Sequence, residues 1–112
     1  MTEPVIDEAV FNEIASLMGD ALNSFIETYL ENSPKLLAAM KSAIPADDLE
    51  AVAHNAHQLK GGSGSIGGMQ IFRLAKQMEE DARQLKKNNL GQVLAELEAA
   101  YGVLAQELKT RL

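Results

Sequence analysis

The sequence contains no cysteine and no tryptophan, and aromatic residues occupy only 4% of its 112 positions. Without cysteine, disulfides, thiol catalysis and cysteine metal ligands are excluded, and this composition suits a reducing cytoplasm. No run approaches the roughly 18 uninterrupted apolar residues that indicate a membrane-spanning helix. The N-terminus also lacks the pattern of a signal peptide. We therefore expect a cytoplasmic protein that does not enter a membrane.

Basic residues are also scarce, because 10 Lys and Arg stand against 16 Asp and Glu, for a formal charge of −6. A general nucleic-acid binder needs a basic surface for phosphate contacts, so this class is disfavoured. The same acidity argues against binding to an anionic membrane. The chain has neither a Gly-x-x-x-x-Gly-Lys-Ser/Thr run nor a kinase ATP-binding segment, so we expect no autokinase activity.

The chain does have a high apolar content, 46%, rich in alanine and leucine at helical spacing. These residues favour helices over strands, and the length suits one domain over residues 1–112. After an extended lead-in over 1–6 and a short first helix, we predict four longer helices at about 20–44, 47–65, 68–87 and 90–111. Short connections imply antiparallel neighbours. The expected fold is all-α, a four-helix up-and-down bundle with the short N-terminal helix packed over one end.

Caps and breakers mark the expected helix ends. Asp7 and Asp20 are the expected N-caps of the first and second helices, and Gly19 is the expected stop between them. Two acids at 47–48 begin the third helix. Pro34 should either kink the second helix or begin a new helix that Ser33 caps. We favour one kinked helix, because the apolar spacing continues across the proline.

Apolar repeats predict which face of each helix is buried. The first helix should bury the stripe Ala9, Val10, Ile14, Leu17 and Met18, with Phe11 outside it. The fourth should bury Ile71, Leu74, Ala75, Met78, Ala82 and Leu85. In the last helix, Gly102 indicates close packing against a neighbour. Its heptad rhythm also suits a coiled-coil dimer, but about three heptads beside other apolar helices favour a monomeric bundle.

The most unusual stretch is Ala56–Gly68, which holds His57 and five of the eight glycines. On the expected helix, His57 lies roughly 115° from the centre of the apolar face, at its border with solvent. Lys60 lies one turn further on, and Gly61 and Gly64 follow His57 along nearly the same stripe. Each helix glycine costs about 1 kcal/mol relative to alanine. Either the helix ends near Gly61, or it continues through Gly64 and the missing side chains let another protein reach His57.

This stretch resembles the signature of histidine-containing phosphotransfer (HPt) domains: Ala56-His57-x-Leu59-Lys60-Gly61-x-Ser63-Gly64-Ser65-Ile66-Gly67. HPt domains carry phosphoryl groups between receiver domains in bacterial and plant phosphorelays. The resemblance implies the four-helix bundle and a continuous third helix. It also implies that His57 accepts a phosphoryl group from a receiver-domain aspartyl phosphate and passes it to another receiver domain.

The resemblance further implies a phosphocarrier rather than an enzyme. Its partners would be response regulator receiver domains and a hybrid sensor histidine kinase. This chain would bind no cofactor, with Mg²⁺ on the partner receiver. Two alternatives stay open from the residues alone: a helical adaptor without phosphotransfer chemistry, and a metal-binding bundle.

Two residues are expected to support His57. The third and fourth helices should form an antiparallel hairpin, which puts 76–79 level with His57 at about 1.5 Å per residue. Glu79 stands where the family often has a polar residue that hydrogen-bonds the active imidazole, so the resemblance implies that it orients one ring nitrogen. A solvated surface acid is the alternative for Glu79. Lys60 is expected to offset the charge gained on phosphorylation.

An expected docking patch lies around this pair of helices and comprises His54, Met69, Arg73 and Lys76. Arg73 and Lys76 are one turn apart and would join Lys60 in a positive patch, although a solvated helix face explains them equally well. His54 is three residues before His57, whereas zinc-protease helices space their histidines four apart around a glutamate. No third ligand presents itself, so we expect no metal site.

Overall fold

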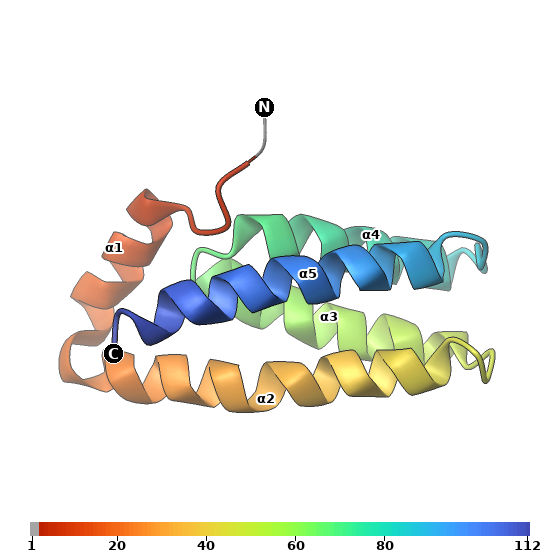
Figure 1. Cartoon of the computed structure of the whole chain (residues 1–112), viewed down its shortest axis with the longest axis horizontal. Helices are drawn as coiled ribbons and strands as arrows, with labels where there is room; N and C mark the ends of the chain where they lie inside the picture. Colours follow the sequence, from red (N-terminus) through yellow and green to blue (C-terminus); the bar gives the residue numbers. More distant parts are fainter. Residues whose placement is uncertain (1–2) are drawn as a thin grey trace.

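The computed structural model describes residues 3–112 and consists of helices joined by short turns (Figure 1). The helices are α1 (Glu8–Met18), a 3₁₀ turn (Gly19–Ala21), α2 (Leu22–Ala43), α3 (Leu49–Ser65), α4 (Met69–Arg83) and α5 (Leu90–Lys109). Helices α2 to α5 alternate in direction, each packs against the next, and α5 returns to α2. Helix α1 lies across one end of this bundle (Figure 1). The predicted four-helix bundle is confirmed.

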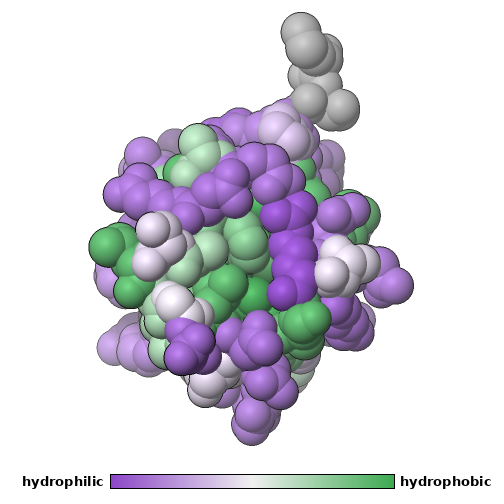
Figure 2. Space-filling model, turned by 90° about the vertical axis from the view of Figure 1, so that its left-hand side faces the viewer, coloured by the Kyte–Doolittle hydropathy of each residue, from purple (hydrophilic) through white to green (hydrophobic). Residues whose placement is uncertain are grey.

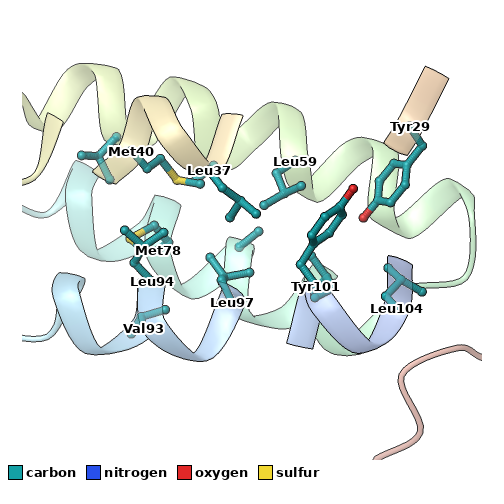
Figure 3. Packing of buried hydrophobic residues seen from close by; sticks show 14 of the residues in the cluster. Tyr29, Leu37, Met40, Leu59, Met78, Val93, Leu94, Leu97, Tyr101 and Leu104 are labelled. Atoms are coloured by element: carbon teal, nitrogen blue, oxygen red, sulfur yellow. The ribbon is translucent and has the colours of Figure 1, made fainter. Parts of the chain in front are cut away.

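The inward faces of α2 to α5 form one apolar core (Figure 3). Side chains that are almost fully buried include Ile26, Met40, Leu59, Ile71, Met78, Leu97 and Leu104. Full burial of a side chain of this size stabilises the fold by about 1.5–3 kcal/mol. These contacts fix the rotation of each helix about its axis. They therefore also decide which residues of α3 face outward.

Helix α1 begins and ends at the predicted residues. Asp7 caps it as predicted, because its side chain accepts hydrogen bonds from the backbone N–H groups of Ala9 and Val10. Gly19 ends it with a φ of 52°. The segment before it lies outside any helix from Glu3 onward, and the part of the expected lead-in at residues 1–2 lies outside the described residues.

The predicted buried face of α1 was wrong. Phe11 is the one residue of α1 that is buried, whereas Leu17 is 76% exposed. Because α1 crosses the end of the bundle, only a narrow part of it touches the core, and Phe11 occupies that contact. The guanidinium of Arg111 covers the Phe11 ring at 4.8 Å and binds the Glu8 carboxylate with two nitrogens. Apolar surface remains open at this end (Figure 2).

Two predicted helix starts need correction. Asp20 lies in the 3₁₀ turn and does not cap α2, which begins at Leu22 without a side-chain cap. Asp48 caps α3 by accepting from the backbone N–H of Ala51 at 3.1 Å. Asp47 instead has a φ of 59° and pairs with Lys87 at 2.7 Å, so it belongs to the turn before the helix.

Helix α4 ends four residues earlier than predicted, at Arg83. The turn is closed by two backbone hydrogen bonds, from Leu85 N–H to the Ala82 carbonyl and from Lys86 N–H to the Asp81 carbonyl. Leu85 has a φ of 60°, a conformation that helix C-termini usually give to glycine. Its side chain is exposed, so the expectation that it is buried was wrong. Helix α5 likewise ends at Lys109 rather than 111.

Helix α2 runs through Pro34 as a single helix, as favoured. Proline has no N–H to donate to the carbonyl of Leu30, four residues earlier. The Tyr101 hydroxyl on α5 donates a long hydrogen bond, 3.4 Å, to that carbonyl. A contact between helices thus replaces part of the bond that the proline removes.

Helix α3 continues to Ser65, so the interpretation in which it ends near Gly61 was wrong. The chain turns at Gly67, which has a φ of 86°. A Cβ there would lie 3.0 Å from the Asp7 carbonyl oxygen, and the Gly67 carbonyl accepts from Asp7 N–H at 2.7 Å. Glycine at this position therefore lets the start of α1 pack onto the turn between α3 and α4.

Candidate functional site

His57 stands on the outward border of α3, with 61% of its side chain exposed. Its Nδ1 lies 3.0 Å from Oε2 of Glu79 on α4. An ionised carboxylate only accepts hydrogen bonds, so Nδ1 carries a hydrogen and donates it. In the neutral ring, Nε2 is then left with a free lone pair. The contact selects one tautomer of an exposed imidazole and leaves Nε2 as its nucleophilic atom.

Glu79 is the centre of an ionic cluster that also contains Lys60, Arg83 and His57. Only 7% of Glu79 is exposed. Lys60 Nζ lies 2.8 Å from Oε1, and Arg83 donates from Nε at 3.1 Å and from Nη2 at 2.9 Å to Oε2. Burial alone raises the pKa of Glu79, but the hydrogen bonds from Lys60 and Arg83 and the charges of Lys60 and His57 lower it to about 2. The carboxylate is therefore ionised at neutral pH.

Lys60 was expected to offset charge on the phosphorylated ring, and in this structure its ammonium binds the Glu79 carboxylate. Arg83 was missed in the sequence. The signal was present, because Glu79 and Arg83 are four residues apart, the spacing of ion pairs on one helix face. With a neutral ring, one carboxylate and two cations leave the cluster with a net charge of +1. A positive charge at this place suits an incoming phosphoryl group.

The two glycines that follow His57 differ in their surroundings. A Cβ on Gly61 would have no neighbour within 4 Å, so nothing in the fold requires glycine there. A Cβ on Gly64 would lie 3.0 Å from Cδ2 of Phe72 on α4. Gly64 is thus explained by the close approach of the Phe72 ring, which no spacing in the sequence indicated. Because Gly61 has no side chain, no group projects from α3 at this position beside His57.

One residue of the expected docking patch, Arg73, faces away from Lys60. Arg73 pairs with Glu3 and lines a groove between α4 and α5. It is therefore not brought to Lys60, and the expected positive patch loses one member. Met69 is half-buried and Lys76 is exposed. His54 is exposed on α3, where its Nε2 lies 3.1 Å from the Gln58 amide nitrogen.

A groove of about 490 Å³ runs between α2 and α3, on the other flank of α3 from Glu79. The residues that line it include Phe25, Asn32, Lys35, Leu36, Gln58 and Gly62. Gln58 directly follows His57 in the chain, about 100° further round α3, so the groove lies along the adjacent face of the helix. It was missed in the sequence because its two walls come from different helices.

Buried hydroxyl groups form the floor of this flank. The Tyr29 hydroxyl lies 2.6 Å from Oγ of Ser63, and the rings of Tyr29 and Tyr101 lie 6.0 Å apart, with their hydroxyl groups directed to the same region (Figure 3). Burial raises the pKa of Tyr29 to about 12, although hydrogen bonds with Ser63 and Ser33 oppose the rise. This cluster is therefore neutral at physiological pH.

Among residues 3–112, no group of three or more His, Asp or Glu side chains is placed to hold a metal ion. Over the same residues, none of the helices has the length and apolar content needed to cross a membrane.

The family comparison decides what kind of domain carries this site. Residues 24–109, which span nearly all of α2 through α5, match the family model for the Hpt domain. The chain belongs to the Hpt family. This Hpt domain is therefore a phosphocarrier with a histidine-phosphotransfer role in phosphorelays, and its partners are two-component proteins such as receiver domains and kinases. Helix α1 lies before the matched region.

Solved structures show the same fold. Histidine-containing phosphotransfer protein B (HptB) from Pseudomonas aeruginosa PAO1 superposes with a TM-score of 0.94 at 24% identity, over 98% of this chain and 96% of that one. The histidine-containing phosphotransfer protein ZmHP2 from maize gives a TM-score of 0.84 at 18% identity, over 95% of this chain and 81% of the maize chain. No curated protein sequence matches this one.

Proposed function

We propose that His57 is the phosphoryl acceptor of this Hpt domain and that it reacts through Nε2. The observation that carries the proposal is the hydrogen bond between Nδ1 and Glu79 on a ring that is 61% exposed. An exposed histidine without such a partner samples both tautomers. Here the carboxylate holds the hydrogen on the inward nitrogen and turns the other nitrogen outward.

In the forward step, the lone pair of Nε2 attacks the phosphorus of a receiver-domain aspartyl phosphate. The N–P bond forms, the P–O bond breaks, and the aspartate carboxylate leaves with the electron pair. Nδ1 keeps its hydrogen, so the ring acquires positive charge, which the adjacent Glu79 carboxylate stabilises. Charge neutralisation on the phosphoryl oxygens comes mainly from the receiver, where we expect Mg²⁺ to be bound. Transfer to a second receiver reverses these steps.

The charges of the cluster support this direction of attack. Lys60 and Arg83 outweigh Glu79 by one positive charge, which favours the approach of an anionic phosphoryl group. Both cations bind the same carboxylate as the ring, so their hydrogen bonds to Glu79 also hold them close to His57. We expect Lys60 to reorient toward the phosphoryl group once it is attached.

The receiver is proposed to dock over the outward face of α3 and the groove between α2 and α3. Gly61 adds no side chain to this face, and the groove supplies apolar surface from Phe25 and Leu36 along the adjacent face. We further propose that the chain has no autokinase activity, acts as a monomer in the cytoplasm, and receives its phosphoryl group from the receiver domain of a hybrid sensor kinase.

Incubation with a receiver domain that carries labelled phosphate tests the assignment. Wild type and His54→Gln should both acquire an acid-labile label, and His57→Gln should acquire none. His54 is the matched control, because it is a second exposed histidine on the same helix. A label that persists in His57→Gln, or that disappears in His54→Gln, would show that the wrong histidine has been chosen.

A further inference from the structure

We propose that Arg83 is a positioning residue that weakens the pull of Glu79 on the His57 proton and so keeps the ring neutral and nucleophilic. The proposal rests on the assignment of His57 as the acceptor. It gives Arg83 a role that acts on the imidazole through the carboxylate, without contact between Arg83 and the phosphoryl group.

The first observation is the sharing of one oxygen atom. Oε2 of Glu79 accepts from His57 Nδ1 at 3.0 Å, from Arg83 Nε at 3.1 Å and from Arg83 Nη2 at 2.9 Å. A carboxylate oxygen has two lone pairs, so three N–H groups compete for them. The bond to His57 is therefore weaker than in a simple pair of histidine and carboxylate. Lys60 occupies the other oxygen, so the carboxylate has little freedom to rotate.

The second observation is the balance of charge. A lone carboxylate beside an imidazole favours the protonated ring, which has no lone pair with which to attack phosphorus. With Lys60 and Arg83 present, protonation of His57 raises the charge of the cluster from +1 to +2. Without Arg83 it would raise the charge only from 0 to +1. Arg83 thus makes protonation of the ring less favourable.

Other charged groups lie on the elements around the ring. They include Glu50 and His54 on α3, Lys76 and Glu80 on α4, and Lys35 on α2, which lines the groove. All five are exposed, and among the described residues only His57, Lys60 and Arg83 bind Glu79. The side chain of Arg83 is itself 59% exposed, so water and salt reduce its influence on the ring.

A purely structural role for Arg83 must be separated from this one. Arg83 is the last residue of α4, where a cation also interacts favourably with the helix dipole. That interaction would change the stability of α4 without changing the titration of His57. The test therefore measures the imidazole itself.

The experiment is ¹⁵N NMR of the His57 ring across pH, on the full chain without a receiver. Arg83→Gln should move the pH at which the ring gains its second proton upward, because it removes a positive charge close to the ring. Arg83→Lys keeps the charge and should recover most of this difference. Arg73→Gln is the matched control, because Arg73 lies on the same helix and pairs with Glu3 instead. Arg83→Met is a second neutral variant, for use if the Gln variant does not fold.

An unchanged titration in a folded Arg83→Gln or Arg83→Met variant would overturn the proposal, as would an equal shift in Arg73→Gln. The pH profile of phosphotransfer should move in the same direction as the titration. Because the titration needs no partner, its failure leaves the assignment of His57 intact. Conversely, a label on His57→Gln would refute that assignment without altering the measured effect of Arg83 on the ring.

Discussion

The two flanks of α3 are built from different chemistry. Toward α4, the buried Glu79 carboxylate binds two cations and the His57 ring. Toward α2, the buried polar groups are hydroxyls, with Tyr29 and Ser63 paired at 2.6 Å beneath an open groove. One flank is charged and touches the reacting ring, whereas the other is neutral and lies below the surface where we propose that the partner docks.

This difference separates two requirements of a phosphocarrier. The state of the imidazole depends on charges held within a few ångströms of it. Partner binding depends on a surface that is apolar and unobstructed. Because α3 stands between the two flanks, residues on one side can change without disturbing the other. Substitutions that test this separation are ordered here from the largest expected effect to the smallest.

Glu79→Gln should slow phosphotransfer strongly, whereas Tyr29→Phe should lower stability and leave the transfer rate nearly unchanged. Glu79→Gln removes the charge that orients Nδ1, so we expect phosphotransfer to slow by about 100-fold, the cost of misplacing a reacting group by about 1 Å. Tyr29→Phe removes one buried hydrogen bond and should lower the free energy of unfolding by about 1 kcal/mol. Its transfer rate should stay within about twofold of wild type. Transfer kinetics and urea unfolding of both variants measure this contrast, and equal rates in the two would refute it.

The stability that each flank contributes should respond differently to acid. The pKa of Glu79 is about 2 in the folded chain, against 4.5 for the free group. Because folding lowers it, Glu79 contributes stability above about pH 4.5, and this contribution is lost as the pH falls toward about 2. The difference in unfolding free energy between wild type and Glu79→Gln should shrink by about 3 kcal/mol from pH 6 to pH 2.

Tyr29→Phe provides the control for that measurement. The pKa of Tyr29 is about 12, so its hydroxyl does not titrate in acid. The stability difference between wild type and Tyr29→Phe should therefore be constant over the same pH range. A constant difference for Glu79→Gln as well would mean that the ionic cluster does not stabilise the fold.

The groove can be blocked without touching the charged flank. Asn32→Trp places a large ring in the groove and should weaken binding to a receiver domain by about tenfold, or about 1.4 kcal/mol. Asn23→Trp is the matched control, because nine residues on a helix turn the side chain to the opposite face. Both asparagines are exposed on α2. Calorimetry with the receiver measures the difference, and the His57 titration should be unchanged in both variants.

The smallest effect concerns two exposed helix glycines. Gly61 and Gly102 each have open space where a Cβ would stand, which also corrects the expectation that Gly102 packs closely. Alanine at either position should stabilise its helix by up to about 1 kcal/mol. Only Gly61→Ala should slow phosphotransfer, by about fivefold, because its methyl group faces the partner. Thermal unfolding and transfer rates measure both, and similar rates would show that Gly61 does not provide access.

Local rules predicted most of the fold but not every boundary. Asp7 and Asp48 cap helices as their positions suggest. The predicted end of α4 was wrong at Leu85, because a leucine with positive φ occupies a place where glycine is usual. The predicted buried face of α1 was wrong at Phe11, because the buried face of a helix that crosses the end of a bundle depends on its crossing angle. Periodicity contains no information about that angle.

The sequence by itself determined the helical class, the exposure of His57 at the border of an apolar face, and the family, since these depend on periodicity and on one contiguous motif. Only the tertiary structure decided that Lys60 and Arg83 share the Glu79 carboxylate with the ring, and that a groove opens along α2. Those arrangements join residues on separate helices. Their distances depend on how the core sets the rotation and register of each helix, which no single segment of the chain specifies.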